Sequence, residues 1–261
     1  MILFHDVDGC LNAEDGIQLP MDNHDYNPLQ RQRLSELGIL LDQSPVRWLA
    51  INTGRSLADT ETLVPLINSG KLRYLVVEHG ALIVDLLTES TVEWTGSAAS
   101  KLAEIQILVN WFNDEGLDHF SRRIGHELRT LDKISNLTIA IPDAVDDQHL
   151  FAELRAFVHE ESPFNAEDYV YHYSGTDSFV DIMSSVHKGD GVQRIMELTD
   201  GEQSIAVGNG LNDLPMMEIA DLCVCPANSE PELIECVQRR NGIVGQTNYI
   251  RTTLDWLGTL S

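Results

Sequence analysis

Two carboxylates separated by one residue follow the first apolar run of the chain. Residues 1–4 are apolar, and Asp6-Val7-Asp8-Gly9 begins one residue later. At the end of a buried strand, two carboxylates at this spacing can reach one cation and one phosphorus atom together, and a carboxylate is a competent nucleophile toward phosphorus. Mg²⁺ would offset the charge of the two anions, and Asp8 could pass a proton to the leaving oxygen. Taken alone, the segment is explained equally well as a surface turn, because Asp and Gly favour turns.

Later segments carry further residues that suit a phosphate or a metal. Thr53 and Gly54 follow a second apolar run and can hold a phosphate with a hydroxyl, a backbone N–H and a helix N-terminus. Lys188 can neutralise a phosphoryl group, and Asn212 and Asp213 follow another apolar run. Each of these segments has a plainer explanation when taken alone, namely helix capping for the first and last and a solvated side chain for the lysine.

The apolar pattern places these segments at strand ends in an α/β fold. Short apolar runs alternate with longer amphipathic ones, which is typical of parallel strands and the helices that cover them. We predict strands at 1–4, 47–51, 73–77, 204–207 and 222–225, and helices at 27–41, 56–67, 189–198, 214–220, 230–239 and 247–257. Ligands of open α/β sheets bind at the carboxyl ends of the strands, so we expect the polar segments to meet there.

The middle of the chain has a different pattern. We predict helices at 98–113 and 148–161, a strand at 136–141, and an antiparallel strand pair at 169–173 and 178–183. An α+β insert therefore interrupts the α/β core. The predicted architecture is a doubly wound parallel-sheet core formed by residues 1–82 and 186–261, with an inserted α+β domain at residues 83–185.

Composition limits the partners of the protein. Acidic residues outnumber basic ones by 41 to 17 among 261 residues, which gives a formal charge of −24. This balance argues against nucleic acid and against an anionic membrane surface, both of which need clustered Lys and Arg. The four cysteines fit no zinc pattern and indicate a reducing compartment. With no apolar run of membrane-spanning length and no leader before the first motif, we expect a cytoplasmic protein; the oligomeric state stays open.

The order and spacing of these segments change their interpretation. Asp6-Val7-Asp8-Gly9, Thr53-Gly54, Lys188 and the segment 208–213 occur in the order of the four motifs of the haloacid dehalogenase superfamily of phosphatases, which the chain therefore resembles. The resemblance is to the Cof-type and sucrose-phosphatase-like branch, in which a large cap domain is inserted after the third core strand. It implies a Rossmann-like core, a Mg²⁺ cofactor and a small phosphorylated metabolite as substrate.

The resemblance also implies roles by position. Asp6 would be the nucleophile and a magnesium ligand, and Asp8 the general acid and base, with its backbone carbonyl on the metal. Thr53, Gly54 and Lys188 would bind the transferring phosphoryl group, and Lys188 would also pair with Asp6. The remaining implied residues complete the metal site or support the loops: Asn209, Asn212, Asp213, Gly9 and Arg55.

Two residues depart from the family pattern. Cys10 stands where the family usually has Thr, and Asn209 stands where the fourth motif usually supplies an Asp to the magnesium ion. An amide oxygen can still coordinate the ion, but one negative charge is lost. We therefore expect a high magnesium requirement that Asn209→Asp would ease, and nearby acids such as Asp190 or Asp213 could replace the missing charge.

Three further residues are possible substrate contacts. His79 flanks the motifs, and Arg122 and Arg123 lie in the acidic insert, where they could hold the rest of an anionic or hydroxylated substrate. The simpler alternatives are a structural histidine and a solvated, salt-bridged helix face.

The predicted function is hydrolysis of a small phosphate monoester, a sugar phosphate or a phosphorylated glycoside, through an aspartyl-phosphate on Asp6. Two alternatives stay open. One is a phosphosugar mutase of the same superfamily, and the other is a non-catalytic sugar-phosphate-binding descendant, which the neutral Asn209 would favour.

Overall fold

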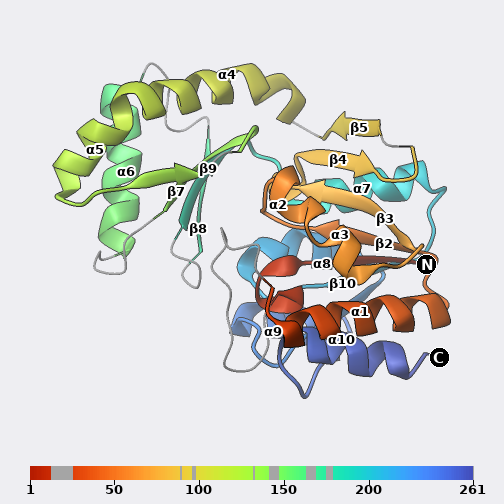
Figure 1. Ribbon diagram of the computed structural model, residues 1–261. Coiled ribbons are helices and arrows are strands. Elements are labelled where there is room, and N and C mark those ends of the chain that lie inside the picture. Colours follow the sequence, from red (N-terminus) through yellow and green to blue (C-terminus); the bar gives the residue numbers. More distant parts are fainter. Residues whose placement is uncertain are drawn as a thin grey trace. The chain divides into compact units, whose positions relative to one another are not determined.

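A computed structural model describes residues 1–12, 26–88, 90–95, 98–131, 133–140, 147–162, 169–174 and 179–260 (Figure 1). The chain divides into two compact units, Met1–Thr95 with His187–Ser261 and Gly96–Val186. The predicted break after residue 82 lies earlier than the first break in the structure. Strands β4 (Leu82–Asp85) and β5 (Ser90–Trp94) extend the main sheet beyond β3 (Leu72–Val77), which places residues 83–95 in the first unit.

The first unit is built on an eight-stranded sheet in the order β12-β11-β10-β1-β2-β3-β4-β5. Strands β12 to β3 are parallel, whereas β4 and β5 pair antiparallel at the edge. The other strands are β1 (Ile2–His5), β2 (Trp48–Asn52), β10 (Ser204–Val207), β11 (Leu222–Cys225) and β12 (Ile243–Val244). The α/β fold class predicted from the apolar pattern is confirmed.

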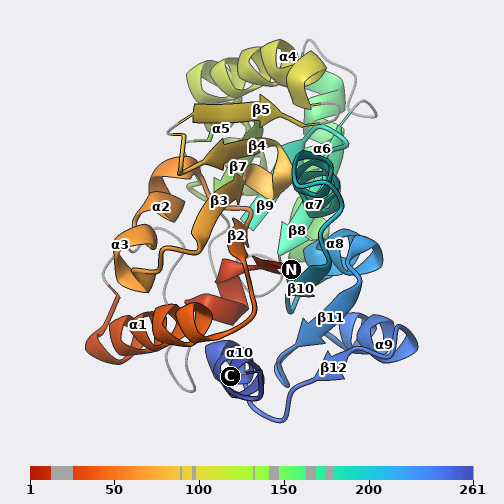
Figure 2. The same cartoon turned by 90° about the vertical axis from the view of Figure 1, so that its right-hand side faces the viewer.

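Helices cover both faces of this sheet, because side chains alternate along each buried strand. In β1, Leu3 packs into one hydrophobic cluster, while Ile2 and Phe4 pack into the other. Figure 2 shows α1, α3 and α10 on one side of the strands and α7, α8 and α9 on the other. Their bounds are α1 (Pro28–Gln43), α2 (Leu57–Glu61), α3 (Val64–Ile67), α7 (Lys188–Leu198), α8 (Leu214–Ile219), α9 (Pro231–Arg239) and α10 (Tyr249–Gly258).

Local chemistry fixes several of the helix ends. Asn27 and Gln30 form a reciprocal capping box at the start of α1, and Pro28 occupies the first helical position, where its missing N–H costs nothing. The single helix predicted for residues 56–67 is divided into α2 and α3. Pro65 lies in the first turn of α3 and lacks the N–H that would continue the α2 ladder.

Three short turns complete the first unit at the carboxyl ends of its strands: η1 (Val7–Leu11), η2 (Glu78–Gly80) and η5 (Leu211–Asp213). In η1 the backbone leaves helical geometry at Asp8 and Gly9, and Gly9 has a φ of 72°. In-register pairing of β1 with β2 and β10 sets His5 opposite Ile51 and Val207. The segments that follow β1, β2 and β10 therefore leave the sheet at the same edge.

The second unit is a four-stranded antiparallel sheet in the order β6-β7-β9-β8 with helices. Its elements are α4 (Ala98–Trp111), η3 (Phe112–Gly116), α5 (Leu117–Ile124), β6 (Arg129–Leu131), β7 (Asn136–Ala140), α6 (Asp147–Glu161), β8 (Val170–Ser174) and β9 (Phe179–Met183). Its core includes Leu137 and Ile139 of β7, Ile182 of β9 and residues of the helices. The α+β composition predicted for the insert is what the structure contains.

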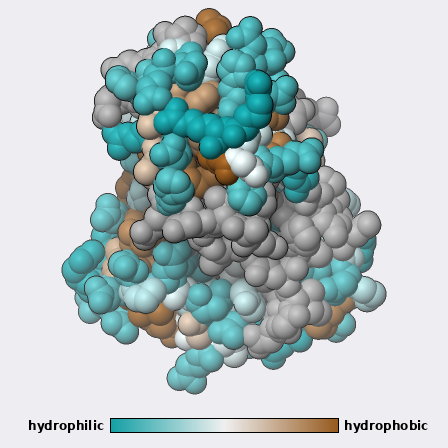
Figure 3. All heavy atoms as spheres, turned by 90° about the vertical axis from the view of Figure 1, so that its left-hand side faces the viewer, coloured by the Kyte–Doolittle hydropathy of each residue, from teal (hydrophilic) through white to brown (hydrophobic). Residues whose placement is uncertain are grey.

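The described surface is largely hydrophilic on the face shown in Figure 3, with small hydrophobic patches between. None of the helices among the described residues combines the length and the apolar character that a bilayer crossing requires.

Candidate active site

Lys188 joins two aspartates that are far apart in the sequence. Its ammonium group donates to Asp6 Oδ1 at 2.6 Å and to Asp213 Oδ1 at 2.6 Å. Asp6 follows β1, Lys188 begins α7, and Asp213 ends η5, so three segments converge at the carboxyl edge of the sheet. All three side chains are buried. Two carboxylates and one ammonium group leave this cluster with excess negative charge.

Burial and neighbouring charges together raise the pKa of both Asp6 and Lys188. Burial and the neighbouring Asp213 carboxylate raise the pKa of Asp6 well above its usual value, although Lys188 opposes the shift. Burial by itself would lower the pKa of Lys188, but Asp213 and Asp6 outweigh it, and the net shift is upward. Lys188 therefore remains a permanent cation, and the cluster would be stabilised by additional positive charge.

Asp8 is held by Arg55 and Asn12. Arg55 donates from Nη2 to Asp8 Oδ1 at 2.7 Å and from Nε to Asp8 Oδ2 at 3.0 Å, a two-pronged contact that suits the planar guanidinium group. Asn12 Nδ2 donates to Asp8 Oδ1 at 2.7 Å, and Asn12 Oδ1 accepts from the backbone N–H of Gly9 at 3.1 Å. Arg55 is buried, and burial by itself would lower its pKa. The Asp8 carboxylate outweighs this effect, so the net shift of the Arg55 pKa is upward. The orientation of Asp8 is thus fixed from both sides.

The segment after β2 is packed tightly against η2. The Thr53 hydroxyl accepts from the backbone N–H of Arg55 at 3.2 Å, and the Thr53 carbonyl accepts from the N–H of His79 at 3.0 Å. A Cβ on Gly54 would lie 2.6 Å from the His79 ring, so no larger residue fits there. His79 is buried with a φ of 61°, a left-handed conformation that only a fixed loop maintains. The ring of His79 therefore lies directly beside the predicted phosphate-binding loop.

Asp213 also organises the loop that contains the altered fourth motif. Its Oδ2 accepts from the backbone N–H groups of Asn209 at 2.8 Å and Gly210 at 3.0 Å. The carbonyl of Asn209 accepts from the N–H of Glu230 at 2.8 Å. Asn212 lies in the same turn, half-buried, near Gly210. Both carboxylate oxygens of Asp213 thus have hydrogen-bond donors within the protein.

The oxygens around Asp6 fit a magnesium ion. Mg²⁺ prefers hard oxygen ligands and usually takes one or two carboxylates, completing its shell with water and substrate oxygens. Asp6 offers a carboxylate, Asn209 offers an amide oxygen on the loop that packs against Gly9, and Asp213 adds negative charge on the other side of Lys188; the Asp8 carbonyl would be a further oxygen of this kind. Among the described residues no three His, Cys, Asp or Glu side chains form a metal-binding group, so the carbonyl and amide oxygens would be needed.

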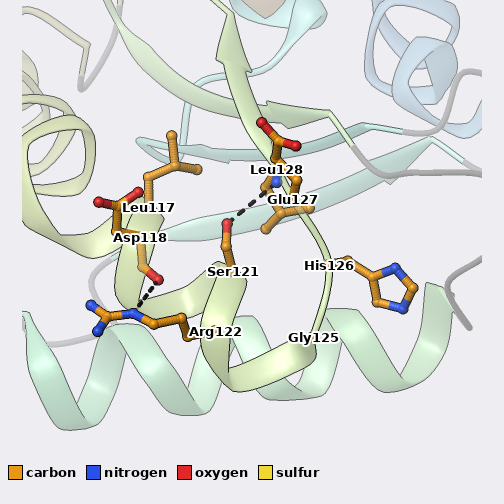
Figure 4. Close-up of a pocket in the computed structure, with 8 residues that line it drawn as sticks. All are labelled: Leu117, Asp118, Ser121, Arg122, Gly125, His126, Glu127 and Leu128. Carbon is orange, nitrogen blue, oxygen red and sulfur yellow. Dashed lines mark hydrogen bonds between the residues drawn. The ribbon is translucent and has the colours of Figure 1, made fainter.

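The predicted arginine contacts lie in the second unit. Arg123 pairs with Glu153 at 2.9 Å and Glu160 at 2.6 Å, which matches the salt-bridged alternative. Arg122 lines an open cavity of about 660 Å³ between α5 and the loop that follows it, and its Nε donates to the Asp118 carbonyl at 3.0 Å (Figure 4). These contacts hold both arginines locally within the second unit.

Several residues outside the predicted site support it through packing, and of these the sequence reasoning missed Asn12, Thr253 and Asn228. His5 is buried, contacts the Asp6 carbonyl through Nδ1 at 2.7 Å and reaches the Thr253 hydroxyl through Nε2 at 2.7 Å. Burial lowers the pKa of His5 to about 4, so the ring is neutral. Asn228 donates to the Gly9 carbonyl at 3.1 Å. Only Asn12 carried a local signal, since it lies four residues after Asp8 in the same turn.

Comparison with known proteins identifies related sequences and folds. A model of the haloacid dehalogenase-like hydrolase family matches residues 47–239, more than half of the chain. No curated protein matches the chain in sequence.

Three solved structures share the fold over nearly their whole length. The Thermoplasma acidophilum protein 0175 aligns with a TM-score of 0.67 at 15% identity, covering 99% of this chain and 97% of that chain. Sucrose-phosphatase from Synechocystis sp. PCC6803, in complex with sucrose and phosphate, aligns with a TM-score of 0.64 at 18% identity, covering 100% and 97%. A trehalose-6-phosphate phosphatase related protein aligns with a TM-score of 0.65 at 16% identity, covering 100% and 98%.

Proposed function

Because the chain belongs to the haloacid dehalogenase-like hydrolase family, as the match over residues 47–239 establishes, we propose that it is a Mg²⁺-dependent phosphatase of small phosphate monoesters. The family membership expected from the four motifs is confirmed. The observation that carries the proposal is the buried Asp6–Lys188–Asp213 cluster at the carboxyl edge of the sheet. Asp6 would serve as the nucleophile.

In the first half of the proposed reaction, Asp6 attacks the phosphorus atom of the substrate. Its Oδ1 is held by Lys188, and Oδ2 receives no hydrogen bond from the described residues, so Oδ2 can approach phosphorus. The bond from phosphorus to the leaving oxygen breaks, and Asp8 gives that oxygen a proton, which requires that Asp8 take up a proton when substrate binds and loosen its contact with Arg55. Thr53, Gly54 and Lys188 would hold the phosphoryl oxygens, while bound Mg²⁺ would supply charge compensation between the two anions.

In the second half, water regenerates the free enzyme. Asp8 takes a proton from the water molecule, whose oxygen attacks the phosphorus atom and displaces the Asp6 carboxylate. Inorganic phosphate leaves, and Asp8 again carries the proton it started with. Asn12 and the loosened contact with Arg55 would keep Asp8 in one orientation through both steps, which is the geometric condition for proton transfer.

The proposed metal ligands are Asp6, the Asp8 carbonyl and Asn209, with Asp213 completing the site. Both oxygens of Asp213 already accept hydrogen bonds. Asp213 would therefore contribute mainly negative charge and order in the loop, and direct coordination of the ion to a lesser degree. Asn212 and Gly9 would support the two loops. We also propose that the second unit, Gly96–Val186, is the substrate-selecting cap of the family.

A sugar phosphate or a phosphorylated glycoside is the proposed substrate class. It is supported by the family and by the names of two structural neighbours, a sucrose-phosphatase and a trehalose-6-phosphate phosphatase related protein. At 18% identity or less this likeness shows a shared fold, so the substrate rests on analogy.

One alternative is favoured by a specific observation. Asn209 removes a carboxylate from the fourth motif, which would suit a protein that binds sugar phosphates without hydrolysing them. The retained Asp6, Asp8 and Lys188 favour catalysis. A phosphosugar mutase would use the same residues but return the phosphoryl group to a sugar.

The test is a screen of phosphorylated metabolites for phosphate release with Mg²⁺, followed by rapid acid quenching and peptide mass spectrometry. We expect phosphate release without a bisphosphate activator and one added phosphoryl group on the peptide that contains Asp6. Asp6→Asn should abolish both signals. Sugar-phosphate binding with no turnover at millimolar Mg²⁺ would favour the non-catalytic alternative, and turnover that persists in Asp6→Asn would exclude the covalent mechanism.

A further inference from the structure

The two residues that depart from the family pattern touch each other. The Cys10 thiol donates to Asn209 Oδ1 with an Sγ to Oδ1 distance of 3.3 Å. Cys10 is buried, so this contact is shielded from water. A thiol is a weak hydrogen-bond donor, and the amide oxygen is its acceptor here. One contact thus links the first and the fourth motif through the two altered positions.

The Asn209 amide is confined on its other sides as well. A Cβ on Gly9 would lie 2.2 Å from Asn209 Nδ2 and 2.9 Å from Oδ1, so the amide packs directly on the Gly9 backbone. The main chain of Asn209 is fixed by Asp213 on its N–H and by Glu230 on its carbonyl. The remaining freedom of the side chain is which end of the amide points toward Cys10.

That freedom matters for a cation, because the two ends of an amide differ. The oxygen binds a cation, whereas the NH₂ group presents two donors and repels it. A carboxylate has an oxygen at both ends, so a half-turn changes nothing. A thiol donates one weak hydrogen bond and is a poor acceptor, which favours the amide oxygen over the amide nitrogen as its neighbour. The amide oxygen has two lone pairs, and the thiol uses one of them.

We infer that Cys10 is a positioning residue that orients the Asn209 amide so that its oxygen can serve as a ligand for a divalent cation. The inference rests on the proposed function, because it takes that cation as the ligand of the site. Cys10 and Asn209 then form a matched pair, in which the thiol supplies the orientation that a carboxylate at position 209 would not need. The effect of removing the thiol should depend on which residue occupies position 209.

A double-mutant cycle with a metal-binding readout tests this dependence. Mn²⁺ takes the same oxygen ligands as Mg²⁺, and the electron paramagnetic resonance signal of the free ion reports the bound fraction without any substrate. The proteins are the native chain, Cys10→Ala, Asn209→Asp and the double variant, each checked for an unchanged circular dichroism spectrum without metal. Displacement of Mn²⁺ by Mg²⁺ confirms that both ions use one site.

We expect Cys10→Ala to weaken Mn²⁺ binding about tenfold in the native background, the usual size for loss of a group that orients a ligand. In the Asn209→Asp background the same change should alter binding less than about twofold. Cys10→Ser, which keeps a donor, should retain most of the native affinity and serves as the matched control if Cys10→Ala folds poorly.

Equal losses in the two backgrounds, or no loss in the native one, would overturn the role of Cys10 while leaving the proposed metal site intact. If the native chain binds no Mn²⁺ that Mg²⁺ displaces, the proposed metal site fails and the inference fails with it. Mn²⁺ binding by the native protein therefore tells the two failures apart.

Discussion

Each unit buries a lysine–aspartate cluster, but the two clusters differ in charge balance. In the first unit Lys188 faces two carboxylates, Asp6 and Asp213. In the second unit Lys133 faces one, Asp181, at 3.0 Å. Thr138 also donates to Asp181, so the second cluster holds one negative charge with an ammonium group and a hydroxyl donor. Among the described residues, the first cluster has more carboxylates than ammonium groups, whereas the second has one of each.

The position of the second cluster in its sheet explains why its charges balance. Thr138 and Asp181 alternate with the apolar core residues Leu137, Ile139 and Ile182, so they occupy the opposite face of the sheet. A buried carboxylate is tolerated there because its charge and its hydrogen bonds are satisfied within the unit. In the first cluster burial, followed by repulsion from Asp213, raises the pKa of Asp6 although Lys188 opposes the shift. The comparison supports the proposal that the first cluster binds a ligand, because the charges of the second cluster already balance within its own unit.

The largest expected contrast is between Asp6→Asn and Asp181→Asn. Asp6→Asn should lower phosphatase turnover by about a thousandfold or more, because it removes the proposed nucleophile. It should not destabilise the fold, since it leaves Lys188 paired with Asp213 and removes a repulsion. Asp181→Asn should lower the free energy of unfolding by about 3 kcal/mol, because it leaves Lys133 buried without a counter-charge.

Turnover at a temperature where both variants are folded, together with urea unfolding, measures this contrast. A large stability loss in Asp6→Asn would show that both clusters are structural and would remove the basis of the comparison.

The lysines offer the next contrast. Lys188→Met leaves two buried carboxylates facing each other and should cost about 3–5 kcal/mol of unfolding free energy near neutral pH. Lys133→Met leaves one carboxylate that still has a hydroxyl donor, so its cost should be smaller. A group whose pKa is raised in the folded state stabilises the fold as pH falls. The penalty of Lys188→Met should therefore shrink as the pH falls from neutral, which parallel urea titrations of both variants would reveal. A penalty that grows toward acid would mean that Asp6 and Asp213 are not the groups left unpaired.

The core strands were predictable from the sequence for a physical reason. Strands of a parallel sheet are buried on both faces, so β1, β2, β3, β10 and β11 read as continuous apolar runs. The edge strands gave weaker signals: β12 has two residues, and β5 contains Ser90, Thr91 and Glu93. Because β4 and β5 were not recognised, the insert was predicted to begin too early in the chain.

The site was predictable as far as strand ends determine it. Asp6, Lys188 and Asp213 could be expected to meet because each lies where a segment reaches the carboxyl edge of the sheet. The partners Thr253 and Asn228 could not, because their contacts depend on how α10 and the loop before α9 pack on the sheet. Side-chain packing of this kind leaves no periodic signal in a sequence.

A smaller contrast concerns the metal requirement of the charged cluster. Asn209→Asp adds a carboxylate to the loop and should lower the Mg²⁺ concentration for half-maximal turnover by about tenfold. The matched control is Asn241→Asp, which adds the same charge at an exposed position of the first unit and should leave the Mg²⁺ dependence unchanged. A Mg²⁺ titration of initial rates measures both. A native enzyme that saturates at the same or a lower Mg²⁺ concentration than Asn209→Asp would show that Asn209 does not weaken the site.

The smallest effect is expected at the surface of the second unit. Arg123 is partly exposed and pairs with Glu153 and Glu160, and ion pairs in such positions contribute less than about 1 kcal/mol to stability because water and salt screen them. Arg123→Gln should therefore change the free energy of unfolding by less than that amount, with the difference vanishing in high salt, and should leave kcat/KM unchanged. Arg122→Gln, on the same turn of α5 beside the open cavity, is the matched comparison. If Arg123→Gln instead raised KM by tenfold or more while stability stayed constant, Arg123 would be a substrate contact. Its ion pairs with Glu153 and Glu160 would then not be its main role. Because the ion pair accounts for the position of Arg123 without a ligand, we expect the structural outcome.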